Sequence, residues 1–429
     1  MAYNRFERHL AALLDSAPGL RAWARSGYRR ANYFLHAWRA GPPRVHPLAN
    51  LRRIAGGAGH GSVEESFFGY FGLQPWSRDG RRHLLHRRLR GRAAVVEISV
   101  HDERAGTTTV LGESRAWNYQ QGAMAQWLVH EGVESVVFND VVGRRLVSRI
   151  VGAAGRETTL DWPIQALRPG APEALSLNYR RLALLRPEYG YRDDVDNFAP
   201  DQPLDSDGLW RFDLRTGRAD LCVSLRELAD AAPAATGEDR HKVNHAVYSP
   251  DGSRFVFMHR WLGPRGKFSR LYAANADGTG LRLLLDHRMV SHYAWRDETT
   301  LLAYARAPEQ GDRYYLIDVP TGSRRAFGAG TLDRFGDGHP SYSPDRLWLV
   351  TDTYPDRARM SRLLLCNVGN GRVTEVGAFH SPWRFDGPVR CDLHPRWNRD
   401  GTEISIDSVH EGRRGVYAVD VSRLLAERP

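Results

Sequence analysis

The sequence predicts an all-β protein, a seven-bladed β-propeller with four-stranded blades that follows a short helical N-terminal segment. From about residue 66, short β-rich runs alternate with Asp-Gly, Pro-Asp and Asn-Gly turns. An aromatic-x-x-Asp-Gly marker recurs, as in VYSPDG (247–252) and RWNRDG (396–401). Seven such units lie mostly some 40–55 residues apart. One twisted four-stranded sheet cannot bury both of its faces, whereas a closed ring of sheets covers each face with a neighbour.

The elements follow the marker along the chain. Residues 1–60 are basic and patchily amphipathic, and we expect a helical extension there; the propeller is expected over 61–425. The seven blades are expected near 66–112, 116–160, 161–225, 241–284, 285–328, 335–382 and 388–424. Each is a strand, a tight turn and a second strand, with third and fourth strands after it. The Pro-containing, acidic stretch 191–208 is expected to be a long loop on one rim.

Composition limits the partners and the compartment. The chain has 429 residues, a net charge of +10 and 3 Cys, too few and too scattered for a disulfide framework. Neither a signal peptide nor an apolar run of membrane-spanning length is found, so we expect a cytoplasmic protein. The positive charge favours an anionic partner. Basic residues are scattered and no nucleic-acid-binding module is recognised, so no nucleic acid is expected. The N-terminal segment could either touch anionic lipid or cover the propeller.

Four histidines occupy one register of the repeat, three residues before the aligned aromatic. They are His245, His292, His339 and His394, in blades four to seven. The innermost strands of a propeller line its central channel, so residues at one register form a ring around the axis. Converging imidazoles suit a divalent transition metal such as Mn²⁺ or Zn²⁺. The alternative is that each histidine only hydrogen-bonds to the neighbouring blade.

Other polar residues gather near the expected channel mouth. Arginine binds carboxylates through two parallel hydrogen bonds, tyrosine rings stack on sugars, and amides suit the start of a propeller strand. The candidate substrate-binding residues are Asn118, Gln120, Gln121, Arg181, Arg186, Tyr191, Asn244, Arg260 and Arg390. The candidate catalytic residues are His86, His259, Tyr179 and Tyr189. For each of them, the alternative is a purely structural polar residue.

Three stretches carry a resemblance to a known family. NHAVYSPDG, GHPSYSPD and above all HPRWNRDGTEISIDSVHEGRRGVYAVDV resemble the oligogalacturonate lyases and related propeller polysaccharide lyases, most clearly over residues 241–424. The resemblance implies a metal at the channel mouth, typically Mn²⁺ held by histidines and a glutamine, with Zn²⁺ or Ca²⁺ as alternatives. The sequence departs from the family in LHPRW, where one histidine stands in place of His-Pro-His-Pro.

The resemblance also implies a reaction. The metal binds the carboxylate of a uronate, a base removes the C5 proton, and the C4–O bond breaks by β-elimination. His394 matches the family's His-Pro ligand most clearly, and His339, His292 and His245 follow by register. The expected base is His86, His259 or Tyr179, and Tyr189 or Tyr191 is expected to protonate the leaving oxygen. The expected partner is therefore an acidic, uronate-containing glycan. The alternative function is a non-catalytic propeller that binds such a glycan or a protein in exopolysaccharide metabolism.

Overall fold

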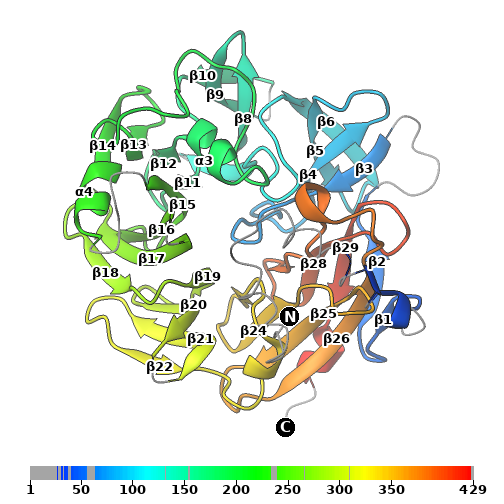
Figure 1. The fold of residues 1–429 in the computed structure, drawn as a ribbon. Helices are drawn as coiled ribbons and strands as arrows, with labels where there is room; N and C mark the ends of the chain where they lie inside the picture. The colour runs from blue at the N-terminus through cyan, green and yellow to red at the C-terminus, as the bar shows by residue number, and fades with distance from the viewer. Residues whose placement is uncertain are drawn as a thin grey trace.

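Seven antiparallel sheets stand around a common axis in the computed structural model (Figure 1), which confirms the predicted seven-bladed β-propeller. The structure describes residues 27, 30–31, 33–36, 40–55, 63–130, 132–152, 155–232, 239–264, 266–308 and 310–426. None of the helices in these ranges has the length and apolar character needed to cross a membrane. The expected membrane contact of the N-terminal segment falls largely outside the described residues.

The first three blades follow the predicted order. Blade one contains β3 (Val63–Phe67), β4 (Arg82–Leu89), β5 (Val96–Asp102) and β6 (Thr107–Ser114). Blade two contains β7 (Gln126–His130), β8 (Val133–Val142), β9 (Arg145–Gly152) and β10 (Glu157–Leu160). Blade three contains β11 (Ala166–Leu167), β12 (Glu173–Leu177), β13 (Gly208–Asp213) and β14 (Ala219–Ser224). Helix α3 (Tyr179–Leu185) and a strand-free stretch separate β12 from β13, where the rim loop was expected. Helix α4 (Leu225–Asp230) follows β14.

The last four blades carry the histidine register. Blade four contains β15 (Arg240–Tyr248), β16 (Arg254–Gly263), β17 (Gly266–Asn275) and β18 (Arg282–Leu285). Blade five contains β19 (Val290–Trp295), β20 (Thr300–Ala307), β21 (Gly311–Asp318) and β22 (Arg324–Ala326). Blade six contains β23 (Ser341–Tyr342), β24 (Trp348–Asp352), β25 (Met360–Asn367) and β26 (Val373–His380). Blade seven contains β27 (Arg396–Trp397), β28 (Glu403–Ser408) and β29 (Gly415–Asp420). Short 3₁₀ turns η2 (Asp333–Phe335) and η3 (Gly387–Val389) precede β23 and β27, and α5 (Ser422–Ala426) ends the described chain.

Two short strands near the N-terminus belong to the last blades. Strand β1 (Arg44–Val45) pairs with β26 and adds a fifth strand to blade six. Strand β2 (Asn50–Arg53) pairs with β29 and is the outer strand of blade seven. The expected boundary at residue 61 is therefore too late, although described residues between 27 and 36 are helical as expected. Neither strand carries the aromatic-x-x-Asp-Gly marker, so the sequence pattern does not reveal them. They are recognised only from the strands with which they pair.

The repeat marker explains the local structure of each blade. In the VYSPDG turn, the Asp251 carboxylate accepts hydrogen bonds from the hydroxyl of Ser249 and the backbone N–H of Ser253. Gly252 follows with a φ of +69°, a left-handed conformation that glycine adopts without strain. Apolar side chains of consecutive blades then bury one another, as Val256 and Met258 of blade four do with Leu301 and Ala303 of blade five.

Blade one departs from the repeat at the channel. Its inner strand β3 stops at Phe67, and pairing resumes only with the bridge between Trp76 and His83. The intervening residues 68–75, which we call the channel loop, enter the centre of the ring (Figure 1). Tyr70 of this loop reaches His245 of blade four, and Phe71 lies against histidines of blades five to seven. The channel loop therefore closes the channel.

The channel loop borders a cavity lined by aromatic side chains and also contacts the register histidines. A cavity of about 470 Å³ is bordered by Tyr70 and Phe71 of the loop. Its lining also includes the aligned aromatics of four blades: Tyr248, Trp295, Tyr342 and Trp397. Each inner segment of blades four to seven thus carries a histidine near its start and an aromatic beside this cavity. The histidines meet the other side of the loop.

Candidate metal centre and channel mouth

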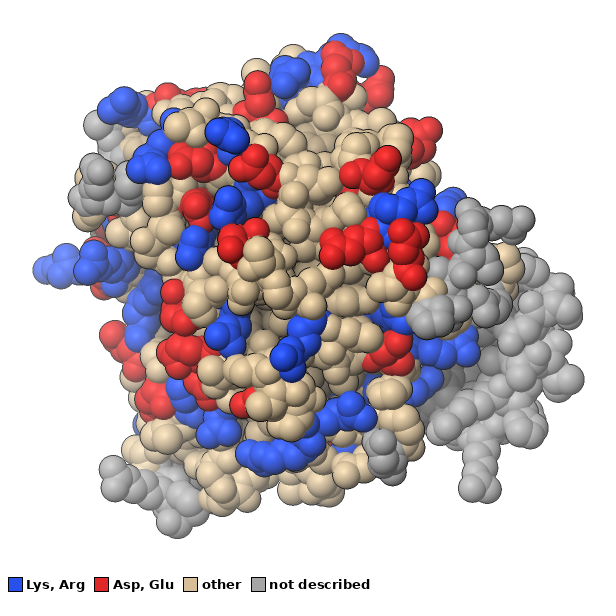
Figure 2. Space-filling view, turned by 90° about the vertical axis from the view of Figure 1, so that its left-hand side faces the viewer, with Lys and Arg blue, Asp and Glu red and all other residues tan. Residues whose placement is uncertain are grey.

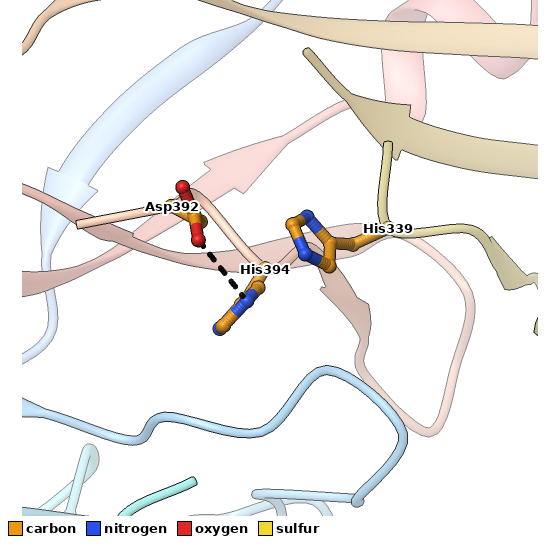
Figure 3. Close-up of side chains that lie close together, drawn as sticks. All are labelled: His339, Asp392 and His394. Atoms are coloured by element: carbon orange, nitrogen blue, oxygen red, sulfur yellow. Dashed lines mark ion pairs between the residues drawn. The ribbon is translucent and has the colours of Figure 1, made fainter. Parts of the chain in front are cut away.

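Three of the four register histidines form one cluster. The ring centroids of His292 and His339 are 4.1 Å apart, and those of His339 and His394 are 4.2 Å apart. All three side chains are buried. Asp392, two residues before His394, joins them: ligand atoms of His339, Asp392 and His394 lie within 4.8 Å of one another. Figure 3 shows these three side chains close together where two neighbouring blades meet the channel.

Each imidazole of the cluster has a hydrogen-bond partner at Nδ1. Asp337 lies 3.1 Å from Nδ1 of His292, and Asp352 lies 2.8 Å from Nδ1 of His339. The carbonyl oxygen of Gly69 in the channel loop accepts from Nδ1 of His394. An imidazole held at Nδ1 in this way presents Nε2 to a metal once that nitrogen has lost its proton, as metal-ligating histidines do. Nε2 of His339 is buried and has no partner among the described residues. The cluster therefore fits a cation bound through Nε2 atoms and the Asp392 carboxylate.

Burial and neighbouring charges together set the pKa values of the cluster histidines and of Asp392. Burial acts to lower the pKa of His339, but the charge of Asp352 outweighs it and the pKa is raised. Burial, followed by the charge of His339, lowers the pKa of His394 well below its ordinary value. Burial opposes ionisation of Asp392, yet Arg390, 2.7 Å away, holds the pKa of that carboxyl below its usual range. Asp392 is thus held as an anion that can bind a metal.

The fourth histidine lies apart from the cluster. Nδ1 of His245 is 2.7 Å from the hydroxyl of Tyr70, and the two rings are stacked. Its own carbonyl accepts a hydrogen bond from Tyr293. Burial, and then the charge of Arg260, lowers the pKa of His245 well below its ordinary value, so the imidazole is neutral. The structure therefore does not group His245 with His292, His339 and His394.

The backbone supports the predicted register at two of the four histidines. His245 and His394 have left-handed φ values of 57° and 46°, and Met124 of blade two has 52°. The alignment of the repeat puts Met124 in the same position as the histidines, and a left-handed conformation at a residue other than glycine is uncommon. The three blades therefore share one backbone geometry at the start of their inner strands.

The candidate bases of blades one, three and four lie inside or between blades. Nε2 of His86 accepts from the backbone N–H of Ala123, and its ring stacks on Phe67. Nε2 of His259 is 2.9 Å from Nδ1 of His241. The hydroxyl of Tyr179 is bonded to Ile164 and Gln165 and is fully buried. None of the three contacts the histidine cluster in the described structure.

The predicted substrate-binding residues divide into two groups. Arg181 is bound to the buried carboxylate of Asp207, Tyr191 accepts from Asn139, and Asn118 caps the turn that contains Gln120 and Gln121. Gln120 donates to the carbonyl of Arg390, and the amide of Gln121 is buried without a partner among the described residues. These contacts are structural. The second group is Arg186, Asn244, Arg260 and Arg390. Arg390 binds Asp392 beside the cluster, and Arg186 and Arg260 lie close enough to lower the pKa of His245.

Tyr189 connects this second group to the cluster. Its hydroxyl accepts a hydrogen bond from Arg390 at 3.1 Å, and Arg390 in turn binds Asp392. The Tyr189 ring packs edge-on against His245, with a centroid distance of 5.3 Å. Arg186 lies over the Tyr189 ring at 4.9 Å. Sequence reasoning did not select Tyr70, Phe71, Asp337, Asp392 or Lys242. Of these, Asp337 and Asp392 carried a signal, because each stands two residues before a register histidine, His339 and His394.

Known structures share this architecture. An oligogalacturonate lyase in complex with manganese superposes with a TM-score of 0.59 and 17% identity, over 89% of this chain and 98% of that one. The fold is that of the oligogalacturonate lyases. The oligogalacturonate lyase of Vibrio parahaemolyticus has a TM-score of 0.58 and 14% identity over the same shares of the two chains. No model of a known protein family matches the sequence, and neither does any curated protein. The predicted resemblance to oligogalacturonate lyases is confirmed at the level of the fold.

Proposed function

We propose that this protein is a lyase that cleaves a uronate-containing glycan by β-elimination, with a divalent metal at the histidine cluster. The observation that supports it most is the group of three imidazoles whose Nδ1 atoms are all engaged, beside the Asp392 carboxylate. A mixed imidazole and carboxylate set suits Mn²⁺ or Zn²⁺ better than Ca²⁺, which prefers oxygen ligands alone. The manganese in the compared lyase favours Mn²⁺. His292, His339, His394 and Asp392 would hold it.

The first chemical requirement is an acidic C5 proton. A bound divalent cation withdraws electron density from the substrate carboxylate and so lowers the pKa of the neighbouring C–H. Arg390 lies beside the same site with its charge shared between Asp392 and the Tyr189 hydroxyl. It would orient the sugar that carries this carboxylate.

The second requirement is a proton acceptor within reach of C5. We assign it to His245, in place of the bases expected from the sequence. His245 is neutral, Tyr70 fixes its ring at Nδ1, and no hydrogen bond to its Nε2 is found among the described residues. Its Nε2 takes the C5 proton while the C4–O bond breaks. The Tyr189 hydroxyl, next to His245, gives a proton to the leaving oxygen.

The proposal is tested by incubating the purified protein and Mn²⁺ with uronate polysaccharides and following the ultraviolet absorbance of the C4–C5 unsaturated product. We expect turnover that a chelator abolishes and that His394→Ala lowers at least ~100-fold. His287→Ala, at a partly exposed site outside the cluster, is the matched control and should leave the rate unchanged. Activity that survives both chelation and His394→Ala would remove the metal from the mechanism.

A second candidate function is binding without cleavage. The cluster histidines are between 2% and 6% exposed, and the channel loop closes the channel behind them. Limited access favours a propeller that holds an acidic glycan or a protein partner. Binding of a uronate oligosaccharide by metal-loaded protein, with no unsaturated product at any pH, would support this function over the lyase.

A further inference from the structure

Three polar side chains with few partners among the described residues lie on one face of blade four. Lys242 of β15 is directly opposite Arg260 of β16, and Asn244 follows two residues later on the same face of β15. Lys242 is 7% exposed and Asn244 is 1% exposed. Three residues at ~3.3 Å each separate Lys242 from His245 by about 10 Å along the strand. The set therefore lies at some distance from the proposed base.

These side chains have capacity for hydrogen bonds that the described structure does not use. Both side-chain atoms of Asn244 and Nε of Arg260 are buried without a partner. Arg260 donates one hydrogen bond, to the carbonyl of Val290, and within the described residues neither Arg260 nor Lys242 forms an ion pair. A native protein seldom buries so many unsatisfied polar atoms together unless a ligand completes them.

The charges that face Lys242 are mainly positive. Arg260, Arg186 and Lys267 act on it. The one carboxylate among them, Glu188, is itself 3.7 Å from Arg186. Burial, followed by the charges of Arg260 and Arg186, lowers the pKa of Lys242 to about 6. Burial, and then Arg186, lowers the pKa of Arg260 to about 10. An anion in this position would neutralise a local excess of positive charge.

We propose that Lys242, Asn244 and Arg260, together with Arg186, form a second subsite that binds a carboxylate. The subsite rests on the proposed function: it takes the carboxylate of the sugar next to the one held at the histidine cluster. The arginine fork and the asparagine amide donate hydrogen bonds, and the lysine supplies a charge once it is protonated. The preferred substrate is then a glycan with two uronates in succession rather than isolated uronates in a neutral chain.

Binding at this subsite is coupled to a proton. The free protein holds Lys242 largely neutral above pH 6, whereas a bound carboxylate restores the pKa of the ammonium group toward its ordinary value. A carboxylate that binds at pH 7.5 therefore draws about one proton from the buffer. Its affinity falls as the pH rises, because the neutral lysine must be protonated at a lower proton concentration.

The experiment is calorimetric titration of metal-free protein with two-residue oligomers of galacturonate and of glucuronate, with lactose as the neutral comparison. Titrations in Tris and in triethanolamine at pH 7.5 give the number of protons taken up. We expect a uronate oligomer to bind with uptake of about one proton, and lactose not to bind. Lys242→Met should weaken binding about tenfold and abolish the uptake. Arg282→Met removes a positive charge from an exposed position on the outer strand of the same blade and should change neither.

Three results would overturn the subsite: no uronate binding by metal-free protein, unchanged binding in Lys242→Met, or binding without proton uptake. Circular dichroism and thermal melting verify that the variants are folded. The lyase assay is a separate measurement. Proton-coupled binding in a protein that yields no unsaturated product refutes the proposed function but not the subsite. Turnover of a two-residue uronate with a KM that Lys242→Met leaves unchanged refutes the subsite but not the function.

Discussion

At the scale of single residues, Asp352 couples two blades at the candidate metal centre. One carboxylate oxygen accepts from the backbone N–H and from Nδ1 of His339, both at 2.8 Å. The other oxygen accepts from the backbone N–H of His394 at 3.0 Å. Asp352 therefore fixes the start of two inner segments and also the ring orientation of His339. It is a positioning residue for the metal, not a ligand.

We predict that Asp352→Asn weakens Mn²⁺ binding about 10- to 100-fold, because His339 loses the charged acceptor that orients its ring. Calorimetric titration of metal-free protein with Mn²⁺ measures the change. Asp345→Asn, on the exposed turn of the same blade, is the matched control and should bind Mn²⁺ as the wild type does. Equal affinities for all three proteins would show that Asp352 acts on stability alone.

At the scale of elements, the channel loop determines which groups lie next to His245 and His394. The Asp407 carboxylate accepts from the backbone N–H groups of Phe68 and Gly69, at 3.0 and 2.8 Å. Arg396 donates to the carbonyl of Gly69 at 2.8 Å. Blade seven thus holds a loop of blade one, and this loop supplies the carbonyl that binds His394 and the hydroxyl that binds His245. The orientation of the His245 and His394 rings therefore depends on this contact between blades one and seven.

We predict that Gly69→Ala destabilises the protein by about 2–4 kcal/mol. Gly69 has a φ of +98°, and an added Cβ would lie 2.7 Å from the backbone nitrogen of Gly122. Gly80→Ala, on a turn of the same blade, is the control: its φ is +70° but the space around it is open. It should cost only about 1–2 kcal/mol for the left-handed backbone. Urea denaturation measures both, and equal losses would mean that the close approach at Gly69 is relieved elsewhere.

At the scale of the whole molecule, the ring is closed by chain segments from opposite ends. Leu51 of β2 is opposite Val419 of β29 and packs against the blade-seven core. Arg52 lies 2.8 Å from both Glu403 of blade seven and Glu103 of blade one. Figure 2 views the ring from its side and shows lysine or arginine residues together with aspartate or glutamate residues on this face. The net charge of +10 therefore does not form a single patch there.

We predict that Leu51→Asp destabilises the entire propeller by about 2–4 kcal/mol in one cooperative transition, because a charge in β2 opposes closure of the ring. Leu283→Asp, in the outer strand of blade four, is the control. This strand follows the rest of its blade directly in the sequence, and the Leu283 side chain is 43% exposed. The substitution should cost about 1 kcal/mol or less. Guanidinium unfolding followed by tryptophan fluorescence compares the two. If Leu51→Asp shifted only part of the unfolding curve to lower guanidinium concentration, blade seven would unfold independently of the other blades.

The sequence by itself determined the number of blades, the turn chemistry of each and the shared register of His245, His292, His339 and His394. These are local properties that repeat with a period, so they can be recognised without knowledge of any distant contact. Even the pairing of Asp392 with His394 lay within two residues in the sequence.

Only the tertiary structure decided what these histidines do together. Blade one breaks its own repeat, and its loop separates His245 from the cluster through contacts between residues far apart in the sequence, such as Tyr70 with His245. The closing strands β1 and β2, the hydrogen-bond partners of His86, His259 and Tyr179, and the charges around Lys242 depend on such contacts too. A repeat pattern gives the position of each side chain on its own blade, but the folded ring sets which groups from different blades share a buried site, and burial together with neighbouring charge then sets their chemistry.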